Sequence, residues 1–179
     1  MKRLKRIVAV IFVVGVLLLA IGFLLPSRPV VQRSVVTTAS PQSLFPLIAS
    51  PKRWEEWTAW NTTRFADMKT RFEGPDSGVG AIMIAEGKSS GNGKVTVTRA
   101  EPDKGVWYDL DFEHGMQIFH CSITFAPAGN AQRVTWALEG EMGNNPVRRW
   151  VGPFLDKLMG RDLATGLANI KTKAEAAKP

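Results

Sequence analysis

The sequence VWYDLDFEHGMQIFHCSITFAPAGNAQRVTWALE (residues 106–139) decides the fold, because it contains three segments of alternating apolar and polar residues joined by short turns. Alternation with a period of two predicts strands whose apolar side chains share one face of a sheet. The turns are too short for crossover connections, so the strands are expected to be antiparallel neighbours. The predicted strands cover residues 106–113, 116–126 and 132–139.

The alternation assigns a common apolar face to these three strands. The charged residues between the apolar ones, such as Asp109, Asp111 and Arg133, fall on the opposite face, where water solvates them. One face of the sheet therefore needs cover from another layer of structure. Its apolar residues are Tyr108, Leu110, Phe112, Phe119, Cys121, Ile123, Phe125, Val134, Trp136 and Leu138.

The cover is expected from the C-terminal segment, where apolar residues recur at helical spacing. Asn145 and Pro146 form a helix start signal, and Gly152 with Pro153 predicts a kink or break soon afterwards. A helix over about residues 154–174 would run roughly 30 Å, enough to cross the whole sheet. The apolar residues of this segment are Val147, Trp150, Val151, Phe154, Leu155, Leu158, Met159, Leu163, Leu167 and Ile170.

Three further strands are predicted before residue 106, at residues 30–38, 81–86 and 94–100. Residues 65–80 are predicted to be a loop, because they end in the turn-rich sequence GPDSGVG. Short turns connect the later strands, so the sheet is expected to be an antiparallel meander.

Two short helices are predicted between the first strand and this loop. Ser40 is a favourable N-cap and Pro41 a favourable first helical residue, but Pro46 is expected to interrupt the helix. A second short helix is expected to begin at Pro51. It would carry Trp54, Trp57 and Trp60.

The N-terminal segment is a candidate membrane span. Residues 7–25 are nineteen consecutive residues without a charge, and a helix of that length spans about 28 Å, close to the hydrocarbon thickness of a bilayer. A basic flank at residues 2–6 precedes this apolar run. The basic flank is expected to stay in the cytoplasm, which places the rest of the chain on the extracytoplasmic, or periplasmic, side.

A cleaved secretory signal is the alternative interpretation, because it also begins with basic residues and an apolar run. Ala20-Ile21-Gly22 would then be its cleavage site. We favour an uncleaved anchor, because the apolar sequence FLL continues the run beyond that point. The chain is accordingly divided into an anchor at residues 1–26 and a single domain at residues 27–179.

Composition limits the partners of the domain. Residues 1–29 contain five basic and no acidic residues, which leaves 18 basic and 16 acidic residues in the other 150. A domain with so little net charge lacks the concentrated basic surface of a nucleic-acid-binding protein. Cys121 is the single cysteine, so no disulfide within the chain is expected.

Four stretches carry a resemblance to a known family. The chain resembles the START-like superfamily, also called SRPBCC, and within it the bacterial proteins of polyketide cyclase/dehydrase type. The resemblance runs from about residue 30 to residue 175. The matching stretches are WEEWTAW (54–60), FEGPDSGVGA (72–81), RVTWALEG (133–140) and GRDLATGLANIK (160–171).

The resemblance implies an α+β helix-grip fold, in which a curved antiparallel sheet surrounds a long C-terminal helix and leaves an elongated apolar cavity between them. Members of the superfamily bind lipids, sterols, polyketides, quinones or hormones, and some catalyse cyclisation or dehydration. This chain differs from the soluble members in its N-terminal transmembrane helix. That difference favours a ligand derived from the membrane over a role in polyketide tailoring.

The sequence offers two candidates for acid–base catalysis, Glu86 and His120. Glu86 ends an apolar strand, and burial would raise its pKa if the side chain faced the cavity, but a carboxylate at the rim or in a turn is the simpler interpretation. His120 lies on the polar face of its strand, so a surface role is the simpler interpretation of this residue. No metal site or cofactor is predicted, because the sequence contains neither a zinc-ligand spacing nor a glycine-rich phosphate loop.

Apolar side chains are the better candidates for a site. They could line a cavity of several hundred Å³, roughly the size typical of small-molecule pockets. The alternative is that they fill an ordinary core at normal packing density. The candidate ligand-binding residues are Trp57, Trp60, Tyr108, Phe112, Phe119, Trp136, Phe154, Leu158 and Met159.

Three functional hypotheses follow. The leading one is a membrane-anchored START-like domain that binds a small apolar ligand, such as a lipid, a quinone or a polyketide-like molecule, without catalysis. The second is an enzyme of cyclase or dehydratase type that uses the same cavity, and the third is a membrane-tethered protein-interaction module. Nothing in the sequence fixes the oligomeric state.

Overall fold

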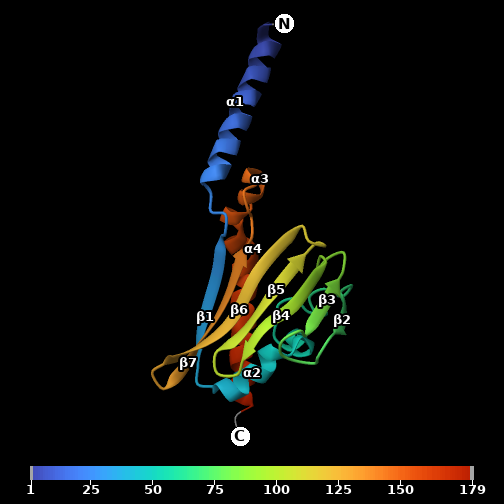
Figure 1. The fold of residues 1–179 in the computed structure, drawn as a ribbon, viewed down its shortest axis with the longest axis vertical. Helices are drawn as coiled ribbons and strands as arrows, with labels where there is room; N and C mark the ends of the chain where they lie inside the picture. The colour runs from blue at the N-terminus through green and yellow to red at the C-terminus, as the bar shows by residue number, and fades with distance from the viewer. Residues whose placement is uncertain (1, 178–179) are drawn as a thin grey trace.

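The computed structural model of the protein describes residues 2–177. Its N-terminal helix α1 (Lys2–Leu24) extends away from the rest of the chain, and a twisted antiparallel sheet wraps around the long helix α4 (Gly152–Ala176) (Figure 1). The sheet has seven strands in the order β1-β7-β6-β5-β4-β3-β2. This arrangement confirms the predicted α+β helix-grip fold.

Six strands agree with the prediction to within a few residues, and one strand was missed. The predicted loop at residues 65–80 contains the edge strand β2, which pairs with β3 alone. The sequence of β2 shows little alternation of apolar and polar residues, because most of its residues are polar and exposed. Its pairing with β3 therefore depends mainly on backbone hydrogen bonds. The strands are β1 (Val30–Thr37), β2 (Lys69–Glu73), β3 (Ile82–Glu86), β4 (Gly93–Glu101), β5 (Gly105–Phe112), β6 (Gln117–Ala128) and β7 (Ala131–Gly140).

Helix α2 (Pro41–Ala49) begins as predicted, since the Ser43 amide donates a hydrogen bond to the Ser40 hydroxyl at 3.3 Å. The prediction that Pro46 interrupts this helix is wrong. Pro46 is exposed on the outer side of the helix, while the side chains that face the sheet bury enough apolar surface to hold the turn.

The second predicted helix is shorter than expected. It is the 3-10 helix η1 (Pro51–Glu56), so Trp54 lies within it, while Trp57 and Trp60 follow it. The predicted break near Gly152 is confirmed, because it separates the short helix α3 (Pro146–Arg149) from α4.

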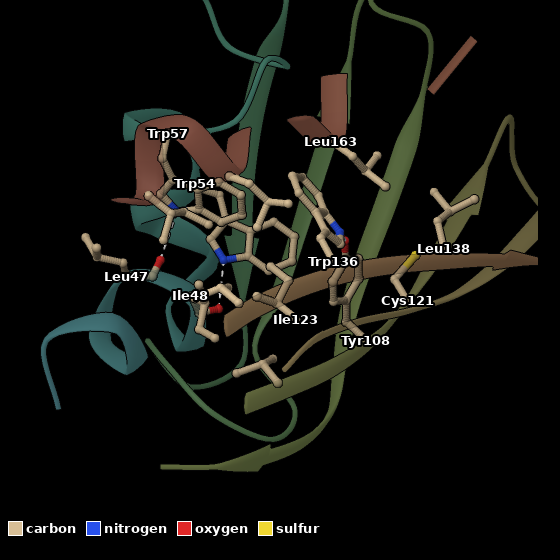
Figure 2. Packing of buried hydrophobic residues seen from close by; sticks show 14 of the residues in the cluster. Leu47, Ile48, Trp54, Trp57, Tyr108, Cys121, Ile123, Trp136, Leu138 and Leu163 are labelled. Atoms are coloured by element: carbon tan, nitrogen blue, oxygen red, sulfur yellow. Dashed lines mark hydrogen bonds between the residues drawn. The ribbon is translucent and has the colours of Figure 1, made fainter. Parts of the chain in front are cut away.

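Tryptophans tie the short helices to the sheet, as Figure 2 shows. The indole N–H of Trp54 donates to the Ile48 carbonyl at 2.9 Å, and that of Trp57 donates to the Leu47 carbonyl at 3.0 Å. Trp57 is fully buried, and its ring lies 5.3 Å, centroid to centroid, from the ring of Trp136 on β7. The rings of Trp54 and Trp57 are therefore buried against other side chains, and the N–H group of each is hydrogen-bonded.

Helix α4 packs on the sheet through a stripe of buried residues that includes Leu163, Leu167 and Ile170. Gly166 lies in the same stripe, and a Cβ atom added there would lie 2.6 Å from the Trp136 ring. A glycine is therefore needed at this position for the helix to approach the sheet this closely. At its C-terminal end, the Glu175 carboxylate accepts a hydrogen bond from the Thr37 hydroxyl at 2.9 Å.

The expectation that all apolar residues of the C-terminal segment cover the sheet is wrong for one stripe. Val147, Val151, Phe154 and Leu158 are 64%, 42%, 57% and 61% exposed. They recur at helical spacing on the side of the segment that faces away from the sheet, since the other side already supplies the core contacts.

Helix α1 is apolar and makes few contacts with the rest of the chain. Within the described residues, it is the single helix that is long and apolar enough to cross a membrane. Only 6% of its most apolar 18-residue stretch is buried against the rest of the chain. A helix near the N-terminus with these properties fits a membrane span or a signal sequence.

His120 lies on the outer face of the sheet, between two carboxylates. Its Nδ1 atom lies 2.8 Å from an Asp109 oxygen, and its Nε2 atom lies 3.5 Å from a Glu141 oxygen. The hydrogen bond to Asp109 raises the pKa of His120, against a smaller opposing effect of burial. The charged form of the imidazole is therefore favoured in the folded protein.

The close contact at Gly166 predicts that Gly166→Ala destabilises the fold. The added methyl group must displace the Trp136 ring, which costs about 1–3 kcal/mol, and the better helix propensity of alanine offsets about 1 kcal/mol of that. Urea unfolding followed by tryptophan fluorescence measures the difference. Gly160→Ala is the matched control, because its Cβ would meet chiefly the movable guanidinium of Arg33, so an equal loss in both variants would contradict the prediction.

The contact between His120 and Asp109 predicts a stability that depends on pH. The contact's contribution to the free energy of unfolding is fully present below the unfolded-state pKa of histidine, about 6.5. It is lost as the pH rises through the higher folded-state pKa of His120. Wild type should therefore lose more stability than Asp109→Asn between pH 6 and pH 9. NMR titration of the imidazole should show a lower pKa in Asp109→Asn, and an unchanged value would disprove the assigned cause.

Candidate ligand-binding cavity

A small apolar cavity lies between the inner face of the sheet, the η1 region and helix α4. Its volume is about 100 Å³. The sheet contributes residues of β2, β3, β4, β5 and β7, while Met159 and Leu163 contribute from α4. The other lining residues are Pro51, Trp54, Glu55, Thr58, Trp60, Met68, Thr70, Phe72, Met83, Ala85, Ser90, Gly91, Gly93, Val95, Tyr108, Leu110, Phe112, Trp136 and Leu138.

The cavity is smaller than the several hundred Å³ that the sequence led us to expect. A drug-sized ligand needs about 300–1,000 Å³, whereas a dry cavity of about 150 Å³ is known to accept one benzene ring. A cavity of about 100 Å³ matches a single small ring or a short alkyl segment. It is small because Trp57 and Phe119, expected to line it, are packed into the core beside it.

Two aromatic side chains of the lining that carry polar groups, Trp136 and Tyr108, are hydrogen-bonded to each other. The Trp136 indole N–H donates to the Tyr108 hydroxyl oxygen at 2.8 Å, and Figure 2 shows both side chains between the sheet and Leu163. Burial raises the pKa of Tyr108 well above its usual value, so the phenol stays neutral. The pair therefore presents ring surface, and no charge, to the cavity.

Glu55 and Tyr108 are the lining side chains with ionisable groups among the described residues. Glu55 is exposed at the edge, where its carboxylate accepts hydrogen bonds from the backbone amide and the hydroxyl of Thr62. The cavity interior is thus apolar, with a carboxylate at its rim.

Three methionines, Met68, Met83 and Met159, line the cavity from different elements. Methionine is unbranched and adopts several rotamers at low cost, so it adapts to guests of different shape. The cavity also lies against the edge strand β2, whose single neighbour is β3. Both features allow the volume to grow when a ligand enters.

The predicted ligand-binding residues separate into three groups. Trp57 and Phe119 are buried in the core outside the cavity lining, and Phe154 and Leu158 are exposed on the outer side of α4. These four residues do not line the cavity. The prediction included them because periodicity shows only that a face is apolar, and not whether that face lies in the core, at the cavity or in solvent. The predicted residues that line it are Trp60, Tyr108, Phe112, Trp136 and Met159.

Neither catalytic candidate faces the cavity. Glu86 is exposed and borders a polar hollow on the outside of the sheet, together with Arg71 and Lys94. His120 also lies on the outer face, and the neighbouring Cys121 is buried, which raises the pKa of its thiol to about 12. In residues 2–177, no three His, Cys, Asp or Glu side chains are grouped so that they could hold a metal ion.

Several lining residues were missing from the prediction. Met68, Thr70 and Phe72 come from the segment that was predicted to be a loop. Val95 and Leu110 alternate with outward-facing residues, so the two-residue period could have identified them. The first group depends on the pairing of β2, which the local sequence does not signal.

Solved structures share this fold at low sequence identity. A norcoclaurine synthase point mutant from Thalictrum, in complex with a transition state analogue, matches with a TM-score of 0.63 and 14% identity over 85% of this chain and 97% of that one. Protein MLL2253 from Mesorhizobium loti matches with a TM-score of 0.58 and 16% identity, over 84% and 99% of the two chains. Ara h 8.0201 matches with a TM-score of 0.56 and 11% identity, over 83% and 99%. At these identities the likeness shows the fold alone.

A search of curated protein sequences found no match. The model of one family, described as polyketide cyclase / dehydrase and lipid transport, matches residues 28–175. That range covers all seven strands, the short helices and nearly all of α4. The chain therefore belongs to the polyketide cyclase/dehydrase and lipid transport family of START-like proteins.

Proposed function

We propose that the protein is a membrane-anchored domain that binds a small apolar ligand, such as a lipid chain, a quinone ring or a polyketide-like ring, in the cavity between the sheet and α4. The observation that supports this most directly is the lining itself. It is almost entirely apolar, and its buried polar pair, Trp136 and Tyr108, needs no partner from the ligand.

The driving force is the burial of apolar ligand surface, which contributes about 25 cal/mol per Å² removed from water. Part of this gain is offset by the lost freedom of the ligand and of the side chains that become ordered around it. A ring or chain terminus that fills the present cavity would leave the rest of a larger ligand near the rim. Adjustment of Met83 and Met159 would admit more of it.

Helix α1 would tether the domain to the bilayer. Its 23 residues correspond to about 34 Å, enough to span a hydrocarbon core of about 30 Å. The basic flank supports a cytoplasmic N-terminus, and the domain would then lie on the extracytoplasmic side. An anchored cavity would sample ligands that partition into the membrane.

Binding without catalysis is favoured, because Glu86 and His120 both lie outside the cavity. An enzyme of this fold would need an acid or base near the reacting atoms. Glu55 at the rim is the remaining carboxylate, and it is already held by Thr62.

Native mass spectrometry of the full chain, released from its membrane in detergent, tests ligand binding. We expect a retained small-molecule mass on the wild type and its loss in Gly93→Val. The valine fills the cavity beside Leu110 and Phe112, and its Cβ comes no closer than 3.5 Å to another side chain or backbone atom outside its immediate neighbours. Thr96→Val is the matched control on the outer face of the same strand.

The comparison between the two valine variants decides the result. Retention of the adduct in Thr96→Val with at least about a tenfold loss in Gly93→Val, equivalent to about 1.4 kcal/mol, supports the cavity as the site. An adduct that persists equally in both variants places the ligand elsewhere. Carbonate extraction and the intact mass of the membrane fraction separately show whether α1 is retained.

A further inference from the structure

An exposed apolar stripe begins on α3, which packs against α1, and runs onto the first turns of α4. It consists of Val147 on α3, Val151 in the connection, and Phe154 and Leu158 on α4. Trp150 lies beside the stripe and, with Val147, forms one wall of an apolar groove whose other wall is the second half of α1. A contiguous apolar surface of this kind requires a nonpolar partner.

Specific hydrogen bonds hold α3 against α1. The Arg149 guanidinium donates to the carbonyl oxygens of Phe23 at 2.8 Å and Leu25 at 3.3 Å, so it satisfies the C-terminal end of the helix. The Trp150 indole N–H donates to the Leu18 carbonyl at 3.1 Å. Gly22 packs so closely on Pro146 that an added Cβ would lie 2.5 Å from the Pro146 carbonyl oxygen.

These contacts set the depth of α3 relative to α1. Leu18 precedes the end of α1 at Leu24 by six residues, or about 9 Å along the helix axis. If α1 spans the bilayer, Trp150 and Val147 lie beside its last turns, below the lipid surface. Amphipathic segments of membrane-bound proteins lie about 5–10 Å deep, at the boundary of headgroups and acyl chains.

We propose that α3 inserts into the outer leaflet of the bilayer that α1 spans, and so forms a second membrane contact that holds the domain against the lipid surface. This inference rests on the anchor role proposed above for α1. It explains why Val147 on α3 remains outside the core, and it gives Trp150 the interfacial position that tryptophan prefers.

The charge of the segment fits a phospholipid surface. Residues 146–161 contain four basic residues and one acidic residue. Basic side chains at the edge of an inserted helix extend toward headgroup phosphates while their stems stay in apolar surroundings.

The insertion would also bring the cavity close to the lipid. Leu158 belongs to the exposed stripe, and the next residue, Met159, lines the cavity. The apolar stripe that begins on the inserted helix α3 therefore ends beside the ligand site. This geometry favours a ligand that carries an acyl or isoprenoid chain and enters from the outer leaflet.

Fluorescent labels at introduced cysteines test the depth in the full chain. The protein is reconstituted into phosphatidylcholine–phosphatidylglycerol vesicles whose acyl chains carry bromine, which quenches a nearby fluorophore. Cys121 does not compete for the label, because its thiol is buried and its pKa is raised to about 12. The labelled variants are Val147→Cys on α3, Gly15→Cys within α1 and Asp103→Cys at the β4–β5 turn.

We expect about a twofold or greater loss of fluorescence at positions 15 and 147, and no change at position 103. Quenching at 15 without quenching at 147 would overturn the second contact and leave the anchor intact. Absence of quenching at both would overturn the anchor as well, whereas ligand binding is judged separately by the mass of the adduct. A disulfide between two copies at position 147 would instead show that a second copy covers α3, which also overturns the proposal.

Discussion

The contact between Gly166 of α4 and the Trp136 ring of β7 controls how close the long helix comes to the sheet. An added Cβ would lie 2.6 Å from that ring, so the helix backbone itself forms part of the core. Trp136 in turn packs against Trp57, which is anchored to the Leu47 carbonyl. The short helices, the sheet and α4 therefore meet at a single aromatic cluster.

The same cluster limits the cavity. Trp136 and Tyr108 form part of its wall, and the hydrogen bond between them leaves neither polar group in need of a ligand. Because the large rings pack against one another, they leave about 100 Å³ between the sheet and α4. The adjustable part of the wall lies on the other side, where Met83 and the edge strand β2 can move at lower cost.

Helix α4 has one buried and one exposed apolar stripe. The buried stripe, which includes Leu163 and Leu167, packs against the sheet, while Phe154 and Leu158 remain exposed. In the proposed arrangement, lipid covers Val147 on α3, where the exposed stripe begins. The domain would then be held at the membrane by α1 and by its own surface, with the cavity close to the source of its ligand.

Sequence alone determined the alternating strands, the long C-terminal helix, the break at Gly152 and the apolar N-terminal helix, because each depends on a local period or on a local backbone signal. Only the tertiary structure decided that β2 joins the sheet edge and that α2 continues through Pro46, since both depend on contacts with distant segments. It also divided the apolar residues into core, cavity lining and exposed stripe. Periodicity identifies an apolar face, but the segment that packs against that face is chosen by the whole fold.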